Sequence, residues 1–402
     1  MQMWAEEFLQ AGYRVRVITP EPRPTDPFYQ EQLQAPEGVS CVRLPVFDPS
    51  RIVRRRGQNS AGSAGAGGAR GVALKIRDLL KLPDHRRLWN RRVVRMLAND
   101  APGILLTTSP YDSTHLIGHA VKARVPELFW VADFRDSWDH RRWIDGPVSR
   151  FHSWYNDRLE RRVMQSADLL TWFHDIGIEF AGERVGAWVA EKSLAVRNGV
   201  DRQTRARLEA RRREVEGPPR FVHAGTLWSF RFPPGFPDVW LRFVADVLPQ
   251  AELHFYGPIE PDVQHQLDEL AARCPAPVVF HGTVPRETVL DAIASCTAQF
   301  VWSSPAREAI TSKMYEAVAA QRPILFCGHP QGSGATFLRN LGASASVAEA
   351  FSEAALERQL RAFAQASRAG TVRSFVPRLD LDEIATERQI ARLIERLPPA
   401  NG

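Results

Sequence analysis

The residues that could most readily act together in chemistry are two glutamates in the segment 301–328, VWSSPAREAITSKMYEAVAAQRPILFCG. Glu308 lies in a polar loop after an apolar strand, and Glu316 lies on the predicted helix that follows, with seven residues between them. Two glutamates at such a spacing are often unrelated residues of a solvent-facing amphipathic helix. Their setting, between an apolar strand and an alanine-rich helix that leads to a further strand, favours instead a ligand site at the end of a sheet.

The start of that predicted helix favours an anionic ligand. Thr311 and Ser312 are good N-cap residues, and the free amides of a helix start attract phosphate oxygens. Lys313 adds a formal positive charge in the first turn. Glu316 lies one turn beyond Ser312 and is expected to face the same ligand, where a carboxylate suits hydrogen bonds to two ribose hydroxyls. The pattern therefore predicts a site for a phosphate and a ribose together.

A second group of polar residues follows strands predicted in the first half of the chain. Asp133 and Asp136 lie on either side of Arg135, at the carboxyl end of a strand, where open α/β sheets bind ligands. Either carboxylate could be a general base or an anchor for an acceptor hydroxyl; the alternative is a pair with Arg135 that shapes the loop. His115 is expected in the same cleft, with a helix-capping role as its alternative. Ser109 is a further cleft residue, and no G-x-S-x-G elbow surrounds it.

Short apolar strands that alternate with amphipathic helices must position these residues. The predicted strands are Arg14–Thr19, Val39–Val46, Ile104–Thr108, Leu128–Phe134, Leu169–Phe173 and Leu194–Arg197, then Phe221–Ala224, Glu252–Tyr256, Val278–His281, Gln299–Trp302 and Ile324–Cys327. The predicted helices include Ser113–Arg124, Val148–Ser166, Asp238–Leu248, Gln264–Arg273, Arg286–Ser295 and Thr311–Ala320. Such alternation is typical of parallel sheets covered on both faces, and its two series predict an α/β chain of two Rossmann-like, doubly wound domains.

The boundary between the two domains is predicted near the turn Asn198–Asp201. A charged run and a Gly-Pro-Pro sequence follow this turn and precede the second series of strands. We therefore expect one domain over residues 1–200 and a second over residues 201–375. Residues 376–402 are expected to form a C-terminal helix, and the sequence leaves open whether this helix crosses back to the first domain.

The chain begins inside a helix, although a doubly wound domain normally opens with a strand and a Gly-rich turn. Met3, Trp4, Phe8 and Leu9 lie at helical spacing, and the first predicted strand begins only at Arg14. The opening strand of such a sheet lies at its centre. We therefore expect that the first strand of the N-terminal domain is missing from the given sequence.

The composition is that of a globular protein. Of the 402 residues, 44% are hydrophobic and 24% are charged, which excludes a chain that is disordered throughout, a collagen-like fibre and a coiled-coil rod. No window holds the ~18 uninterrupted apolar residues that a membrane-spanning helix needs. The four cysteines form no CxxC pair, so we expect reduced, structural thiols and no metal site.

Positive charge is concentrated in residues 51–95, which contain 13 Lys or Arg and two Asp. Within this basic block the Gly/Ala/Ser-rich residues 57–71 are predicted to be a flexible loop. The pattern favours an anionic membrane surface as the partner of the block, because cations are attracted to anionic leaflets. A solvated face is the alternative. Trp89 is the one aromatic residue within the block, so nucleic acid is not expected as a partner.

The segment 301–328 resembles the donor-binding motif of family-4-like glycosyltransferases (glycosyl transferases group 1), which have the GT-B fold. Residues 221–226, FVHAGT, resemble the strand and glycine turn that open the donor domain of this family. Residues 279–285, VFHGTVP, resemble the loop against which the nucleotide base lies, and Asn198–Asp201 resembles the turn between the two domains. The resemblance extends from residue 2 to about residue 370.

Carried over residue by residue, the resemblance implies a site for a nucleotide-sugar donor. Glu316 would hold the ribose, and Glu308 would contact the donor sugar near its reacting end. Arg231 and Lys313 would neutralise the diphosphate leaving group. Thr226 stands where the family usually has the first of two basic residues. The remaining donor-binding residues are Gly225 and Thr226 at the glycine turn, Thr311 and Ser312 at the helix start, and His281, Gly282 and Val284 at the base.

The resemblance also implies the reaction and its acceptor side. Residues 107–115 and 132–138 resemble the acceptor domain, so a hexosyl or other glycosyl group of a UDP- or GDP-sugar would pass, with retention and without metal or cofactor, to an acceptor held there. With the basic block, this predicts a glycan or polyprenyl-linked acceptor in envelope or exopolysaccharide synthesis, and a cytoplasmic location that includes the inner face of the plasma membrane. Two alternatives remain: a sugar-nucleotide epimerase of the same fold, and a catalytically degenerate sugar-nucleotide-binding protein.

Overall fold

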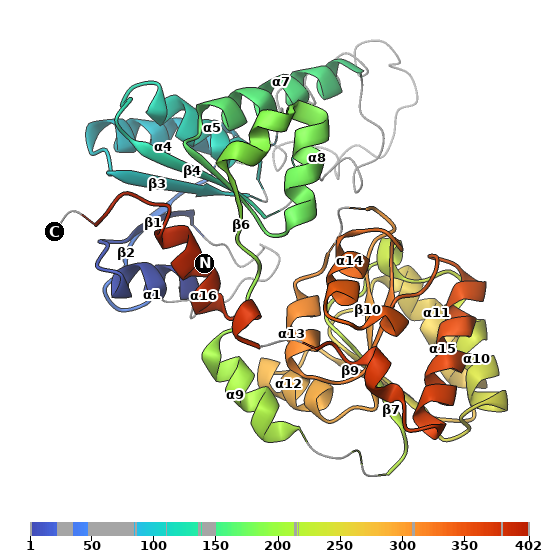
Figure 1. Ribbon diagram of the computed structural model, residues 1–402. Helices are drawn as coiled ribbons and strands as arrows, with labels where there is room; N and C mark the ends of the chain where they lie inside the picture. Colours follow the sequence, from blue (N-terminus) through green and yellow to red (C-terminus); the bar gives the residue numbers. More distant parts are fainter. Residues whose placement is uncertain are drawn as a thin grey trace, which may run out of the picture. The chain divides into compact units, whose positions relative to one another are not determined.

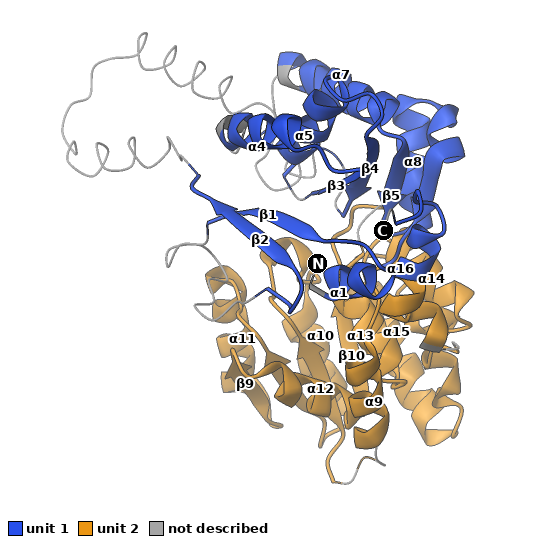
Figure 2. Ribbon diagram, turned by 90° about the vertical axis from the view of Figure 1, so that its left-hand side faces the viewer, with its two compact units in different colours: residues 1–197, 390–402 blue, residues 198–389 orange. Residues whose placement is uncertain are grey.

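The chain forms two compact units, shown in different colours in Figure 2. Unit 1 comprises Met1–Arg197 together with Ile390–Gly402, and unit 2 comprises Asn198–Gln389. The computed structural model describes residues 2–21, 35–46, 84, 87–109, 111–135, 138, 150–212, 215, 217–307, 310–378 and 381–400.

The strands of unit 1 pair in parallel and form two sheets. β1 (Arg16–Pro20) pairs with β2 (Ser40–Leu44), with Arg16 opposite Ser40. The second sheet has the strand order β3-β4-β5-β6. Its strands are β3 (Ile104–Thr108), β4 (Phe129–Phe134), β5 (Leu169–Trp172) and β6 (Ser193–Ala195).

Helices cover one face of the four-stranded sheet and pack on alternate side chains of β4. They are α4 (Arg87–Asn99), α5 (Ser113–Lys122), α7 (Arg150–Ser166) and α8 (Asp175–Val185), with the short η1 (Ala187–Lys192) after α8. Trp130 and Phe134 of β4 are fully buried against these helices, where Trp172 of β5 stacks on Phe134 with ring centroids 4.7 Å apart. This aromatic layer follows from the period-two alternation of a strand.

The opposite face of β4 and β5 is covered by both ends of the chain. Trp4 of α1 (Gln2–Gln10) packs with Val131 and Leu169 of the sheet and with Ile390 and Leu393 of α16 (Thr386–Ile394). Tyr13 also donates a hydrogen bond from its hydroxyl to the carbonyl of Pro398, at 2.8 Å. The last residues of the chain therefore complete the core of unit 1.

Unit 2 contains one parallel sheet with the strand order β11-β10-β7-β8-β9. Its strands are β7 (Arg220–Ala224), β8 (Glu252–Tyr256), β9 (Val278–Gly282), β10 (Ala298–Trp302) and β11 (Ile324–Cys327). β7 is central, with Phe221 opposite Ala298 of β10 on one side and Leu253 of β8 on the other. This order reverses between β7 and β10, and open α/β sheets bind ligands beyond the carboxyl ends of strands at such a point.

Two hydrophobic cores lie on the two faces of the unit 2 sheet (Figure 1). The first holds α10 (Phe236–Asp246), α11 (Pro261–Arg273) and α15 (Glu353–Arg368). The second holds α9 (Arg202–Arg211), α12 (Arg286–Ala294), α13 (Lys313–Ala319) and α14 (Ser333–Asn340). The short helices are η2 (Ser229–Arg231), η3 (Ser344–Ser346), η4 (Val372–Phe375) and η5 (Leu381–Ile384).

The structure confirms the predicted α/β class with parallel, doubly wound sheets. Each predicted strand is present within a few residues, and Ile104–Thr108, Glu252–Tyr256 and Ile324–Cys327 have the predicted bounds. The predicted flexible loop 57–71 lies outside the described residues, as does most of the basic block 51–95.

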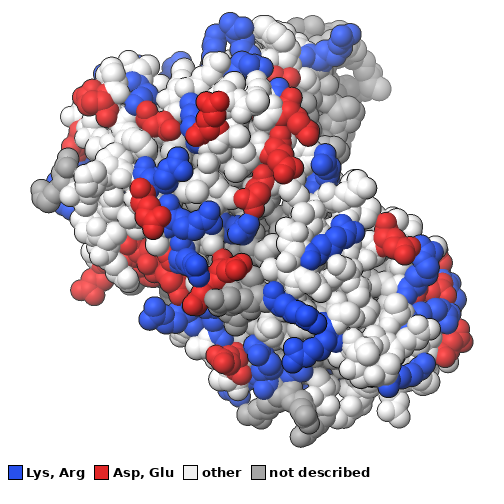
Figure 3. All heavy atoms as spheres, viewed as in Figure 1, with Lys and Arg blue, Asp and Glu red and all other residues white. Residues whose placement is uncertain are grey.

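The surface of the described residues carries both signs of charge. On the face shown in Figure 3, Lys and Arg side chains lie among Asp and Glu side chains in many places. Such pairs are present among the described residues: Arg242 of α10 pairs with Glu353 at 2.8 Å and with Glu357 at 2.9 Å. Among the helices that can be described, none combines the length and the apolar character that a membrane crossing requires.

Candidate active site

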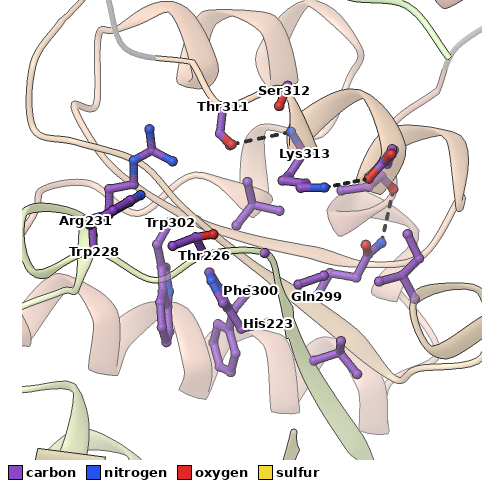
Figure 4. A pocket seen from close by; sticks show the side chains of 17 residues that line it. His223, Thr226, Trp228, Arg231, Gln299, Phe300, Trp302, Thr311, Ser312 and Lys313 are labelled. Carbon is purple, nitrogen blue, oxygen red and sulfur yellow. Dashed lines mark hydrogen bonds and ion pairs between the residues drawn. The ribbon is translucent and has the colours of Figure 1, made fainter. Parts of the chain in front are cut away.

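A pocket of unit 2 opens at the carboxyl ends of the two strands where the strand order reverses. Its floor is built from the ends of β7 and β10, including His223, Phe300 and Trp302. Its walls come from the loop and short helix after β7 and from the start of α13 (Figure 4). The polar and charged residues that line it are His223, Thr226, Arg231, Gln299, Thr311, Ser312, Lys313 and Glu316.

Two cationic side chains face this pocket from different elements. Arg231 comes from η2, after β7, and Lys313 is the first residue of α13. In Figure 4 they lie on opposite sides of Thr226. Two cations on either side of a hydroxyl and a glycine turn are suited to an anion with several oxygens, such as a diphosphate.

The glycine turn after β7 brings backbone close to Lys313. Gly225 has a φ of +119°, and its N–H donates to the carbonyl of Tyr256 at 2.7 Å. A Cβ on Gly225 would lie 3.3 Å from two carbons of the Lys313 side chain. On Gly257, whose φ is +118°, a Cβ would lie 2.7 Å from the carbonyl oxygen of Gly225. Both positions therefore require glycine if the turn and Lys313 are to keep their places.

The start of α13 differs in detail from the expected cap. The helix begins at Lys313, and Ser312 occupies the N-cap position without a side-chain capping hydrogen bond. Thr311 makes the contact closest to a capping hydrogen bond, because its Oγ1 accepts a hydrogen bond from the Lys313 amide at 3.4 Å. Thr311 is buried and Ser312 is exposed, and both hydroxyl residues line the pocket.

The carboxylate of Glu316 is held by two cations at the edge of the pocket. Arg286, the first residue of α12, donates a hydrogen bond to its Oε1 at 2.8 Å. Lys313 approaches its Oε2 at 3.5 Å. Arg286 also donates to Thr204 Oγ1 at 3.0 Å and lies 3.8 Å from Asp201, so a network of four side chains sets the Glu316 rotamer.

Some residues of this site were not singled out in the sequence. They are His223, Trp228, Gln299, Trp302 and Arg286. His223 lies in the segment 221–226 that resembles the opening of the donor domain, but a histidine within a mostly apolar strand is ordinarily a core residue. The rest of α12, strand β10 and a loop separate Arg286 from Glu316 along the chain, so that only the topology brings the two together.

The residues expected at the nucleotide base lie apart from this pocket lining. His281 of β9 stacks on Tyr256 with ring centroids 4.0 Å apart and a 6° interplanar angle. Its Nε2 lies 3.0 Å from Nδ1 of His254, and burial, followed by the charge of His254, lowers the pKa of His281. Gly282 accepts a hydrogen bond from the Gly257 amide at 2.8 Å, and Val284 is half-buried in the next loop.

Two of the expected catalytic carboxylates cannot be placed. Glu308 and Asp136 lie outside the described residues. Their proposed roles therefore remain predictions from the sequence.

Asp133 of unit 1 is a fully buried carboxylate with three side-chain partners. Its oxygens accept hydrogen bonds from Thr171 at 2.7 Å, from Thr108 at 2.8 Å and from Arg135 Nε at 2.9 Å. The guanidinium of Arg135 also lies 4.4 Å from the centroid of the Trp4 ring. This arrangement has the geometry of the structural pair that the sequence left open as an alternative.

The other two residues expected in the unit 1 cleft are close to this pair. The Oγ of Ser109 accepts a hydrogen bond from the Arg135 amide at 2.8 Å. His115 is fully buried, with Nδ1 2.9 Å from Thr107 Oγ1 and its ring 4.6 Å from that of Phe134. Burial lowers the pKa of His115 to about 4, although the charge of Asp133 opposes this shift. His115 is therefore neutral near pH 7.

The described residues bring together no group of three or more His, Cys, Asp or Glu side chains that could hold a metal ion. Cys296 and Cys327 are buried free thiols, and burial raises the pKa of each to about 12. They are unreactive residues of the core.

No protein-family model matches the sequence, and no curated protein matches it significantly. Solved structures are similar in fold. HepE of Anabaena in complex with UDP-glucose superposes with a TM-score of 0.58 at 13% identity, over 95% of this chain and 100% of that chain. Sucrose-phosphate synthase of Thermosynechococcus elongatus gives a TM-score of 0.61 at 13% identity, over 98% and 91%. An apo structure of OtsA gives 0.58 at 10% identity, over 98% and 96%. The chain therefore has the GT-B fold of two Rossmann-like units.

Proposed function

We propose that this protein is a glycosyltransferase that moves a sugar from a nucleotide-diphosphate sugar to an acceptor. One observation carries the proposal: Arg231 and Lys313 face a common pocket beside the Gly225 turn, at the reversal point of the unit 2 sheet. The similar fold of HepE, which was solved with UDP-glucose, supports a nucleotide sugar as the ligand.

In this proposal the two cations stabilise the leaving group. When the bond between the sugar and the diphosphate breaks, negative charge develops on the phosphate oxygens, and preorganised donors stabilise it. Arg231 and Lys313 provide that positive charge, and the Gly225 turn allows backbone to approach the phosphates. The proposed reaction therefore needs no metal ion or cofactor, and it retains the configuration of the sugar, as the family resemblance implies.

Glu316 is proposed to bind the ribose of the donor. Arg286 and Lys313 hold its carboxylate in one orientation at the edge of the pocket. A carboxylate can accept hydrogen bonds from two adjacent hydroxyls. Glu308 is proposed to contact the donor sugar. The base is proposed to lie by Val284 and His281, where the rings of Tyr256 and His281 stack on each other.

The acceptor is proposed to be a glycan or a polyprenyl-linked precursor at an anionic membrane surface. Two helices of unit 1 support this. On α7, Phe151 and Trp154 are 53% and 56% exposed, and the guanidinium of Arg158 lies 5.9 Å from the Trp154 ring centroid. On α4, three arginines that belong to the basic block are exposed: Arg91, Arg92 and Arg95. Exposed aromatic residues with neighbouring arginines are suited to the headgroup region of anionic bilayers.

A transfer assay tests the proposal. The purified protein is incubated with radiolabelled UDP- and GDP-sugars and a membrane extract. Label in the extract that depends on Lys313 is the expected result. A change of the sugar configuration without transfer would identify an epimerase. Binding without either reaction would identify a catalytically degenerate nucleotide-sugar-binding protein.

The membrane part of the proposal has its own test. A double Phe151→Ser, Trp154→Ser variant should float less with vesicles that contain phosphatidylglycerol, and added salt should weaken flotation of the parent protein. Equal flotation of the variant and its parent would rule out α7 as the contact.

A further inference from the structure

His223 is a buried polar residue at the floor of the candidate site. It lies next to the end of β7, two residues before the Gly225 turn, and is 7% exposed. Its ring lines the pocket and stacks on Trp302, with centroids 4.8 Å apart and a 22° interplanar angle. Among the described residues its Nδ1 has no hydrogen-bond partner.

A buried nitrogen without a partner is costly, and in native structures such groups are rare. One reason for their presence is a ligand that completes the hydrogen bonding. Figure 4 shows a ring nitrogen of His223 on the side of Thr226, toward the space between Arg231 and Lys313. The histidine therefore lies on the floor of the pocket, beneath the place where an anion would bind between the two cations.

We propose that His223 is a third ligand-binding residue of this site, which donates a ring N–H to an oxygen of the diphosphate held between Arg231 and Lys313. This inference rests on the proposed function, because it assumes a diphosphate in the pocket. In this proposal the diphosphate is bound by the two cations on the walls of the pocket and by the uncharged ring of His223 on its floor.

The protonation state of His223 fits an uncharged donor. Burial lowers the pKa of His223 to about 4; a hydrogen bond to the Phe300 backbone opposes this shift, and the charge of Arg231 adds to it. The facing charged groups are Arg231, Lys313 and Glu316, and the last is already paired with Lys313 and Arg286. A neutral imidazole has one N–H and one acceptor nitrogen, so it can donate to phosphate without adding a third cation to the two that already repel each other in the pocket.

A purely structural role is the competing explanation, since the ring fills space beside Trp302. His223→Phe separates the two roles because it keeps a flat ring for stacking and removes both nitrogens. His223→Gln keeps an amide donor and serves as the conservative variant. His265→Gln is the matched control, because His265 is an exposed histidine of α11 that pairs with Glu269.

The test compares these variants with the parent protein by calorimetric titration of UDP and GDP, and by melting temperature with and without nucleotide. The loss of one hydrogen bond to a charged oxygen should weaken diphosphate binding by about 10- to 100-fold in His223→Phe. We expect less than about fivefold weakening in His223→Gln, and none in His265→Gln. The unliganded melting temperatures should be similar, so that the variants differ in the shift that the nucleotide causes.

The outcomes separate the inference from the proposed function. If the parent binds UDP or GDP and His223→Phe binds it equally well, the inference is wrong and the proposed function stands. If both His223 variants melt early without ligand and bind normally once corrected for folding, the role is structural and the inference is again wrong. If the parent binds neither nucleotide, the proposed function itself fails, and the inference fails with it.

Discussion

Arg286 donates a hydrogen bond to the Glu316 carboxylate at 2.8 Å, although Arg286 is the first residue of α12 and Glu316 belongs to α13. With Lys313 on the other oxygen, the carboxylate is held between two cations before any ligand enters. Glu316 is thereby kept in one orientation. Arg286 is therefore a positioning residue for the proposed ribose contact.

The first prediction concerns this pair. Glu316→Ala should reduce nucleotide binding by about 10- to 100-fold through loss of the charged hydrogen bonds. Arg286→Ala should have a smaller effect, about fivefold, because it removes only the orientation of the carboxylate. Calorimetric titration measures both. Arg242→Ala, which also breaks contacts to two carboxylates of unit 2, should bind as the parent does. Unchanged affinity in Glu316→Ala would remove the ribose role.

A second prediction concerns the contact between Gly225 and Lys313. Gly225→Ala should impair diphosphate binding, because the new methyl group would press on the Lys313 side chain and the φ of +119° disfavours any side chain. Gly217→Ala is the control, since Gly217 has a φ of +82° with no atom within 4 Å of the added Cβ. Both variants should lose about 1–3 kcal/mol of stability, because an alanine is strained at either positive φ. Only the first should lose affinity, and equal affinities would show that the turn does not meet the ligand.

A third prediction distinguishes the two roles considered for Asp133. As a structural carboxylate it is fully buried and holds Thr108, Thr171 and Arg135, so Asp133→Asn should destabilise unit 1 by about 3–5 kcal/mol. Asp175→Asn, which breaks an exposed pair with Arg197, should cost less than about 1 kcal/mol. Denaturant unfolding measures both. If Asp133→Asn kept its stability and lost only turnover, the general-base interpretation would be favoured instead.

A fourth prediction concerns the pH dependence of stability. The pKa of His115 in the folded protein is about 4, below its ordinary value of 6.5. As the pH falls from 6.5 toward 4, the unfolded chain therefore binds a proton that the folded protein does not. The free energy of unfolding is thus highest above pH 6.5 and decreases over this range. The size is about 3 kcal/mol for this fully buried ring. His115→Leu should therefore unfold with a weaker pH dependence between pH 6.5 and pH 4. A variant with the slope of the parent would contradict the buried neutral state.

The strands could be predicted because short apolar runs bounded by turns carry their own signal. Ile324–Cys327 is one example, where the run follows Arg322-Pro323 and is fully buried in the sheet. Helix Arg87–Asn99 was not singled out, because its arginines obscure the buried Trp89, Val93 and Leu97, which recur every fourth residue. The arginines thus made the helical spacing of the apolar residues hard to recognise in the sequence.

Part of the site could be read from the sequence because its residues are close along the chain. Thr311, Ser312, Lys313 and Glu316 line one pocket, as their spacing suggested. The contacts of this segment with Gly225 and Arg286 depend on β10 pairing beside β7, which no local pattern encodes. His223 could not be found because a histidine within a buried strand is ordinarily a core residue with a partner.

The most direct test of the proposed function is a calorimetric titration of UDP- and GDP-sugars into the protein and into an Arg231→Ala, Lys313→Ala double variant. We expect the protein to bind at least one of these sugars, and the double variant to bind it at least about 100-fold more weakly, because two charge-assisted contacts to phosphate are lost. A protein that binds none of them, or a double variant with the affinity of its parent, would contradict the assignment of this pocket to a nucleotide-sugar diphosphate.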